Sequence, residues 1–154
     1  MNQFNKSGTG YSGNKHNEES NLNFDMIQFD PLPVQLFSEI AEFFAEQIAR
    51  SGKDKHNKPT QIRKFYDELV MWHERTWTGD PKERENRFKE YEPFIRMLTA
   101  KVSYAKGRDN VEANFEKLFH HCIRKVNSAE TLRRCKLFIE AFMGFYKSAA
   151  AHKK

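Results

Sequence analysis

The feature that most constrains the fold is a succession of apolar stripes with helical spacing, each separated from the next by glycine or proline. Such a stripe covers one face of a helix, and that face is stable only when it is buried against other helices. No segment alternates apolar and polar residues over the length of a strand between turn residues. The sequence therefore predicts an all-α protein, a compact bundle of five or six helices.

Proline and glycine delimit the first two expected helices. The first should begin at one of two prolines within residues 30–33, because proline suits the first helical turn, and should end at Gly52. The second should begin at Pro59. The expected buried stripes are Leu36, Phe37, Ile40, Phe43, Phe44 and Ile48 in the first helix and Ile62, Phe65, Tyr66, Leu69, Trp72 and His73 in the second.

A third helical stretch is expected over residues 82–104. Asp80 has the side chain of an N-cap, and Pro81 suits the first helical position. Pro93 lies inside the stretch. Because proline has no backbone N–H and disfavours helical geometry in the residue before it, Pro93 should kink or split the helix near Glu92.

Two more helices complete the expected bundle. Asp109 is the expected N-cap of the first of them, and the second should run from about residue 129 to 149. The chain has 14 Phe, 5 Tyr and 2 Trp, so we expect a core built largely from aromatic rings. The inward-facing sets are Val111, Phe115, Leu118, Phe119, Cys122 and Val126, then Leu132, Cys135, Phe138, Ile139, Phe142, Phe145 and Tyr146.

The N-terminal segment differs in composition from the rest of the chain. Its first twenty or so residues are rich in Asn, Gly, Ser and Lys and carry few apolar side chains. Burial of so little apolar surface cannot offset the entropy lost on ordering. We therefore expect a disordered, flexible tail over residues 1–29 and a single helical-bundle domain over residues 30–150.

Composition and charge exclude several classes of protein. No apolar run approaches the ~18 residues of a membrane span, the start does not resemble a signal peptide, and two cysteines are too few for a disulfide framework. We therefore expect a cytoplasmic protein that does not contact membranes. The net charge is +5, and residues 96–136 contain ten basic and four acidic residues. Such an excess suits a nucleic acid partner, although a solvated helical surface explains the same counts.

Basic residues gather at the start of the second expected helix. Lys58, Arg63 and Lys64 lie within two turns of the free backbone N–H groups there, and Gln61 lies beside them. Terminal N–H groups and guanidinium forks both bind anions, so this end can hold a phosphate backbone. A helix start with exposed basic residues explains the same pattern, and the sequence leaves both readings open.

A second basic group lies at the end of the third helical stretch. Lys101, Lys106 and Arg108 lie near a helix end, where cations also complement the negative end of the helix dipole. Tyr104 lies among them. Its ring either stacks on a base or ribose or lies at the edge of the core, and the sequence does not decide between the two.

Three segments, in order, resemble one known family. They are Lys58-Pro-Thr-Gln-Ile-Arg-Lys-Phe-Tyr66, the segment from Leu98 to Arg108 with its Lys-x-x-Tyr-x-x-Gly-Arg ending, and Leu137-Phe-Ile-Glu-Ala-Phe-Met-Gly-Phe-Tyr146. Together they resemble the small subunit of type III-A CRISPR–Cas effector (Csm) complexes. The resemblance runs from about residue 58 to 146 and leaves the first helix and the tail outside.

The resemblance implies a non-catalytic structural subunit that binds RNA in antiviral defence and needs no cofactor. Proteins of this family stack in several copies inside a filament of backbone subunits, where they line the channel for the guide–target RNA duplex, while the backbone and large subunits carry the catalytic activities. Expected partners are therefore guide RNA, target RNA, the backbone and large subunits and further copies of the chain. The implied RNA-facing residues are Arg63, Lys64, Lys101 and Arg108, with Gln61 and Tyr104 nearby and Lys58 and Lys106 as less direct candidates.

Two other functions stay open at this point. Arg50 and His56, separated by five residues, resemble the Arg-x(4–6)-His signature of HEPN ribonucleases, in which a histidine acts as general acid or base beside a phosphate-binding arginine. Here the pair lies on either side of Gly52 in a charged loop rather than on a core-facing helix. The other alternative is a helical bundle that binds only proteins.

A metal site is not expected. His120, His121 and Cys122, with Cys135, are the residues that suggest one. However, adjacent histidines point about 100° apart on a helix, and Cys122 lies on the apolar face. The sequence contains neither Cys-x-x-Cys nor His-Glu-x-x-His.

Overall fold

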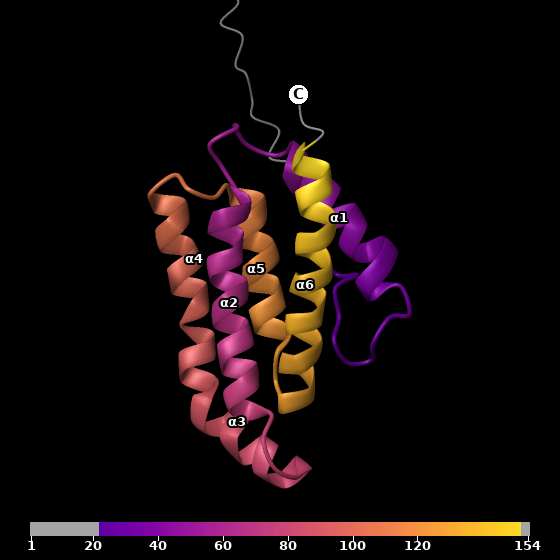
Figure 1. Cartoon of the computed structure of the whole chain (residues 1–154), viewed down its shortest axis with the longest axis vertical. Helices are drawn as coiled ribbons and strands as arrows, with labels where there is room; N and C mark the ends of the chain where they lie inside the picture. The colour runs from indigo at the N-terminus through magenta and orange to yellow at the C-terminus, as the bar shows by residue number, and fades with distance from the viewer. Residues whose placement is uncertain (1–21, 152–154) are drawn as a thin grey trace, which may run out of the picture.

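The computed structural model describes residues 22–151 and confirms the all-α class (Figure 1). No strand occurs in this range, and none of its helices combines the length and apolarity needed to cross a membrane. A short π-helical turn leads directly into the first α-helix, and five more α-helices follow. The elements are η1 Leu36–Ile40, α1 Ala41–Arg50, α2 Pro59–Thr76, α3 Pro81–Arg96, α4 Leu98–Gly107, α5 Ala113–Lys125 and α6 Ala129–Ala151.

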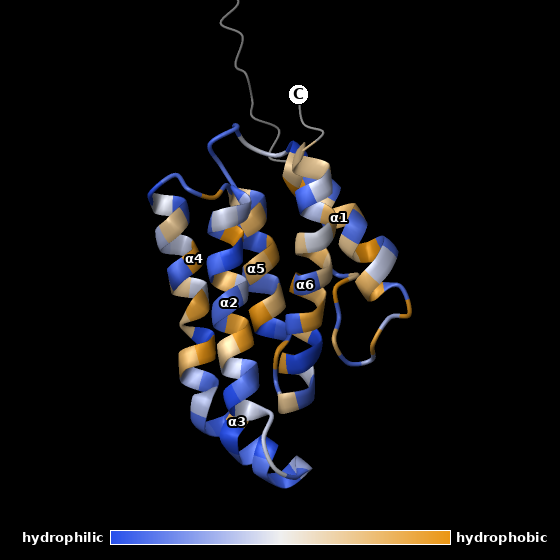
Figure 2. Ribbon diagram, viewed as in Figure 1, coloured by the Kyte–Doolittle hydropathy of each residue, from blue (hydrophilic) through white to orange (hydrophobic). Residues whose placement is uncertain are grey.

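The core lies where α6 packs against α1, α2 and α5. Apolar and polar residues alternate in bands along the helices (Figure 2), and the buried apolar side chains form one cluster. At its centre, Phe65 of α2, Phe115 and Phe119 of α5 and Phe142 of α6 lie with ring centroids 5.7–6.5 Å apart. The expected aromatic core is therefore confirmed. The fully buried rings are Phe29, Phe44, Phe88, Phe115, Phe119, Phe138 and Phe142.

The segment before the first helix is part of this core. Ile27 and Phe29 are almost completely buried, and the ring of Phe24 stacks on Phe44 of α1 with centroids 5.5 Å apart. Nε2 of the buried His121 lies 2.8 Å from the carbonyl oxygen of Ile27. The packed body therefore extends N-terminally beyond residue 30. Of the tail expected over residues 1–29, residues 1–21 lie outside the described residues, and that part stays a prediction.

The first helix begins later than the sequence indicated. Residues 30–34 are irregular, and helical structure starts at Leu36, because two prolines close together disfavour helical geometry in the residues before them. One residue of the expected buried stripe is not buried: Phe43 is 44% exposed. The helix packs mainly against α6, so only one side of its broad apolar surface is covered.

The third helical stretch is split, but at Met97 rather than near Glu92. The helix continues past Pro93, whose carbonyl oxygen still accepts a hydrogen bond from the N–H of Met97 at 3.1 Å. The break is held from outside the helix. The guanidinium of Arg96 donates to the carbonyl oxygens of Ile123 and Val126 at the end of α5. This tertiary contact, rather than the proline, coincides with the end of α3.

The two expected N-caps have different outcomes. Asp80 caps α3 as predicted, since its Oδ1 accepts the N–H of Glu83 at 2.9 Å. Asp109 is not the cap of α5: Glu112 takes that role and accepts two N–H groups of the first turn at 2.8 and 2.9 Å. Asp109 instead has a positive φ of 63° in the turn between α4 and α5.

Replacing Arg96 tests the contact that holds the break between α3 and α4. Arg96→Ala removes two charge-assisted hydrogen bonds to partly buried carbonyls, so we expect the free energy of unfolding in urea to fall by about 1.5–3 kcal/mol. Arg96→Lys should lie between the two, because one ammonium cannot replace a planar fork that reaches both carbonyls. Lys89→Ala, an exposed change on the same helix, is the control. Equal stability of the wild type and Arg96→Ala would show that the contact does not stabilise the fold.

Candidate nucleic-acid interface

An ion pair connects α2 to α4. Nζ of Lys101 on α4 donates to both carboxylate oxygens of Glu68 on α2, at 2.8 and 3.1 Å. The two helices run in opposite directions and lie side by side (Figure 1). The pair therefore fixes which residues of α2 and α4 face outward together.

Helix geometry extends this surface from the ion pair toward one end of the bundle. On α4, Tyr104 and Arg108 follow Lys101 at i+3 and i+7, so they lie on the same face. On α2, Lys64 and Gln61 precede Glu68 at i−4 and i−7, which places them on the same face as well. Each row advances by seven residues along its helix, and with a rise of about 1.5 Å per residue the rows from Lys101 to Arg108 and from Glu68 to Gln61 extend in the same direction for about 10 Å. The α2–α4 face is defined here by Gln61, Lys64, Glu68, Lys101, Tyr104 and Arg108.

Tyr104 lies on this face rather than at the edge of the core. Its side chain is 66% exposed. Nη1 of Arg108 donates to the Tyr104 hydroxyl at 3.2 Å, and this contact raises the pKa of Arg108. The ring and the guanidinium are therefore held together at the surface.

The α2–α4 face is positively charged but not uniformly so. Lys64 is exposed, and within residues 22–151 it makes no ion pair. Lys101 is neutralised in part by Glu68, whose side chain is 33% exposed. Glu68 is not among the residues that the sequence singled out. Its role as the partner of Lys101 depends on α2 and α4 being neighbours, which no spacing within either helix indicates.

The other three candidate residues lie elsewhere, so the structure does not bring all eight together. Arg63 lies on the side of α2 that faces α6, where it pairs with Asp67 at 3.9 Å. Burial and the nearby Glu140 carboxylate of α6 raise the pKa of Tyr66, which shares that side. Arg63 and Lys64 point about 100° apart on α2, because they are consecutive helical residues. The role of Arg63 at RNA stays a prediction.

Lys58 and Lys106 lie on two further sides of the bundle. Lys58 precedes α2 and lines a cavity together with Tyr146 and Ala150 of α6. Lys106 lies about 140° around α4 from Lys101. It follows Ser103, whose hydroxyl lies 3.1 Å from Nε2 of His120 on α5, so it is on the α5 side.

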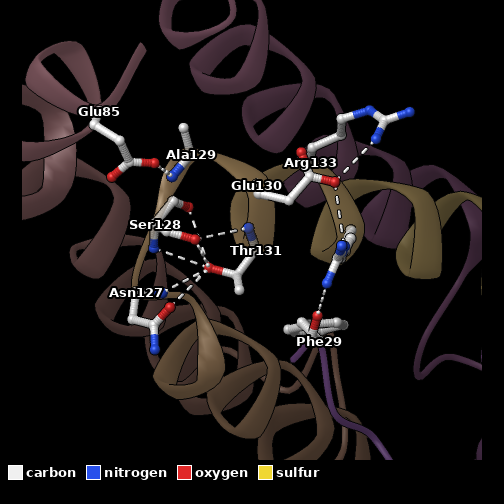
Figure 3. A network of polar contacts seen from close by, with 9 residues as sticks. Phe29, Glu85, Asn127, Ser128, Ala129, Glu130, Thr131 and Arg133 are labelled. Atoms are coloured by element: carbon white, nitrogen blue, oxygen red, sulfur yellow. Dashed lines mark hydrogen bonds and ion pairs between the residues drawn. The ribbon is translucent and has the colours of Figure 1, made fainter. Parts of the chain in front are cut away.

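The basic cluster near the start of α6 is occupied by structural contacts. Glu130 accepts from Nη1 of Arg133 at 3.0 Å and from Nε of Arg134 at 3.2 Å, and Arg134 also donates to the carbonyl oxygen of Phe29 at 2.7 Å (Figure 3). Together with Arg96, these side chains account for part of the excess of basic residues between 96 and 136. Arg96 and Arg134 donate to backbone carbonyls of other segments, whereas Arg133 stays 44% exposed beside Glu130 on its own helix.

Three charged or ionisable residues, Lys55, His56 and Asp109, form a clip that fixes the turn after Arg108. Asp109 Oδ1 lies 2.6 Å from Nε2 of His56, and its other oxygen pairs with Lys55. Nδ1 of His56 accepts the N–H of Lys53 at 2.8 Å, which orders the loop between α1 and α2. Hydrogen bonds from Lys55 and then His56 lower the pKa of Asp109 to about 2.

The structure separates the residues of the ribonuclease alternative. Arg50 lines a cavity between α1 and α6 with Glu42 and Glu46, whereas His56 lines the cavity of Lys58 and Tyr146. Both ring nitrogens of His56 are engaged in the clip to Asp109 and Lys53. The pair therefore shares no cavity in which an arginine could hold a phosphate beside the histidine.

Each residue that suggested a metal has a structural role. Nε2 of His120 lies 3.0 Å from the carbonyl oxygen of Thr99, and His121 contacts Ile27. Cys122 and Cys135 are both buried and free, and burial raises the pKa of the Cys122 thiol. Within residues 22–151, no three His, Cys, Asp or Glu side chains are grouped so that they could hold a metal ion.

The comparisons with known proteins give one match. The family model described as Csm2 Type III-A matches residues 35–152. This range includes η1 and α1, so the resemblance is wider than the three sequence segments indicated, and the first helix does not lie outside it. The comparisons with curated proteins and with solved structures gave no significant match.

The clip at Asp109 predicts a dependence of stability on pH. Because the pKa in the folded state is lowered from 3.8 to about 2, ionised Asp109 stabilises the fold above pH 4, and this contribution is lost as the pH falls toward 2. Asp109→Asn keeps a residue that tolerates positive φ and removes the charge. We expect the wild type to have the higher Tm at pH 6, with the difference shrinking between pH 4 and 2. Asp54→Asn, in the loop that carries Lys55 and His56, is the control, and a difference that does not change with pH would contradict the assignment.

Proposed function

Since the chain belongs to the Csm2 Type III-A family, the small subunit of type III-A Csm complexes, we propose that it lines the channel that holds the guide–target RNA duplex. In this role the subunit binds RNA backbone without sequence specificity and carries out no catalysis. Its partners are guide RNA, target RNA, the backbone and large subunits and further copies of itself, and the complex acts in cytoplasmic antiviral defence.

The observation that carries this proposal is the registration of α2 against α4 by the Lys101–Glu68 pair. It aligns Lys64 with Tyr104, and Gln61 with Arg108, on one exposed face. Cations from two helices, one or two turns apart, match a flexible row of phosphates better than they match a small ligand. Gln61 adds a donor and an acceptor suited to a ribose hydroxyl.

A guide-directed complex also constrains the chemistry of this face. Guides differ in sequence, so a subunit that meets every guide–target pair has to contact phosphate and ribose and leave the base edges to pairing. The α2–α4 face is an exposed surface of side chains on two helices. An A-form duplex presents its phosphates and 2′-hydroxyls at the surface while its deep major groove stays closed to side chains, so such a face can bind it without reading sequence.

Repetition compensates for the small number of contacts in one copy. Three cations on a face provide only a few phosphate contacts, and the affinity of a single chain for RNA is expected to be modest. Copies held side by side by a backbone filament bind the same RNA at high effective concentration. Weak binding per copy is therefore compatible with stable binding in the assembled complex.

Charge reversal on the α2–α4 face should weaken RNA binding. In Lys64→Glu/Arg108→Glu, two phosphate contacts become repulsive, so we expect lower affinity for RNAs of unrelated sequence to a similar degree. The slope of log affinity against log salt should fall by about 1 for each lost contact. The measurement is fluorescence anisotropy with labelled RNA, on the full chain at low salt and on the assembled complex.

Arg63→Glu is the matched control for this experiment. It reverses an exposed charge on the neighbouring side of the same helix, next to Lys64 in sequence. A loss of affinity in Arg63→Glu equal to that of the double variant would contradict the assignment of binding to the α2–α4 face. Unchanged binding in both variants, with intact assembly, would favour a bundle that binds only proteins.

Removing the carboxylate from the α2–α4 face should have the opposite effect. Glu68→Gln releases Lys101 and keeps a side chain of similar size, so the face gains one available cation. We expect higher RNA affinity at low salt and a steeper salt dependence by about one unit. Glu74→Gln, an exposed change further along α2, is the control. A decrease in affinity in Glu68→Gln would show that the ion pair positions Lys101 rather than competing with RNA.

A further inference from the structure

Exposed apolar side chains gather along one edge of the structure, where α3 passes into α4. Phe94 is 50% exposed, Met97 49% and Tyr104 66%. Met97 and Tyr104 lie on the same face of α4 as Lys101 and Arg108, at i, i+4, i+7 and i+11. The aromatic–cationic stripe is defined here by Phe94, Met97, Lys101, Tyr104 and Arg108. Helix rise separates Met97 from Arg108 by about 16 Å, and Phe94 lies on α3, just before the break.

The rings at the two ends of this stripe are held in place by neighbours. Phe94 stacks on Trp72 of α2 with centroids 5.6 Å apart and an interplanar angle of 9°. Trp72 is itself fixed between Tyr91, 5.4 Å away, and the guanidinium of Arg75, 5.2 Å from its centroid. Arg108 holds Tyr104 through its hydroxyl. Rings ordered in advance lose less side-chain entropy when a partner binds.

Phosphate binding does not account for these rings. Lys64, Lys101 and Arg108 suffice to hold a backbone, and a paired strand has both faces of each base covered by its neighbours in the stack. Bases become available to protein rings only where they are unpaired or turned out of the duplex. An exposed aromatic ring beside a row of cations is the arrangement with which proteins bind single strands, because stacking tolerates every base.

We propose that the aromatic–cationic stripe binds unpaired nucleotides of RNA, with bases stacked on Phe94 and Tyr104 and phosphates at Lys101 and Arg108. This inference rests on the proposed function and specifies the kind of RNA that this surface selects. Single-stranded segments bind it more tightly than a continuous duplex of the same length, and the preference resides in the rings.

Charge favours RNA over a protein as the occupant of the stripe. The surface around it carries Lys64, Arg75, Lys101 and Arg108 against two carboxylates: Glu68, which is paired with Lys101, and Glu90, one turn before Phe94. Lys101 also lies between Met97 and Tyr104 on α4, so the apolar side chains are separated by a cation instead of forming one continuous patch. A polyanion with flat apolar groups at regular intervals matches both properties, whereas an apolar protein surface would leave the cations without partners.

The test compares single-stranded and double-stranded RNA in binding to the full chain. The probes are a labelled oligouridine and a blunt duplex of the same length, measured by anisotropy at low salt. We expect Tyr104→Leu and Phe94→Leu each to weaken binding of the single strand about fivefold or more, and binding of the duplex less than twofold. Leucine keeps an apolar side chain against Trp72, so the fold is retained, which circular dichroism confirms.

Phe43→Leu is the matched control, since Phe43 is a comparably exposed ring on α1, at 44%. It should leave both affinities unchanged. If single-strand affinity is the same in the wild type and in both ring variants while Lys64→Glu/Arg108→Glu still weakens binding, the stripe does not stack bases and the inference fails, but the proposed function stands. If the wild type binds neither RNA at low salt, and the assembled complex with Lys64→Glu/Arg108→Glu binds RNA as tightly as the wild-type complex, both fail.

A second readout places the contact within the assembled complex. Target RNA with 5-iodouridine at single positions crosslinks to side chains that touch the base, and mass spectrometry identifies the residue. Crosslinks to Phe94 or Tyr104 support the inference. Crosslinks confined to other residues or subunits overturn it. Loss of subunit assembly in Phe94→Leu, without a change in RNA affinity, also overturns it and assigns the stripe to a protein partner.

Discussion

The position of the candidate interface depends on the contact between Arg96 and the end of α5. Its guanidinium satisfies two carbonyls that the helix leaves without partners, and it does so from the last residue of α3. An uninterrupted helix over α3 and α4 would extend for about 40 Å in one direction. The break instead lets α4 lie along α5, where His120 contacts Thr99 and Ser103. That placement brings Lys101 to Glu68, and the α2–α4 face follows from it.

The fold could be predicted from the sequence wherever the signal is local. Asp80 and Pro81 mark the start of α3, which begins at Pro81 with Asp80 as its N-cap. The apolar stripes of α5 and α6 identify the buried faces of these two helices. Prediction failed where two local signals compete and a distant residue decides. Asp109 and Glu112 both precede α5, and Glu112 became the cap because Asp109 pairs with Lys55 and His56 from another loop. Pro93 likewise marked the right stretch but not the residue at which it breaks.

The candidate site shows the same limit more strongly. Spacing within α4 places Lys101, Tyr104 and Arg108 on one face, and spacing within α2 does the same for Gln61 and Lys64. Neither helix indicates which neighbour it has. The pairing of Lys101 with Glu68 therefore lay beyond the sequence, as did the assignment of Arg63 to the α6 side. Net charge misled in a related way, because Arg96 and Arg134 look like surface cations in a sequence but donate to backbone carbonyls in the fold.

A subunit that accepts every guide has to bind RNA independently of its base sequence, and two kinds of contact meet this condition. Phosphate contacts do so because the backbone is uniform, and stacking does so because every base has a π-face. The two differ in what they reveal about the RNA, since cations hold paired and unpaired strands alike whereas rings require bases that are free to leave the stack. In the proposed role, Lys64 and Arg108 supply affinity while Phe94 and Tyr104 distinguish the paired state of the strand. A face that combines both is sensitive to whether pairing is complete without being sensitive to sequence.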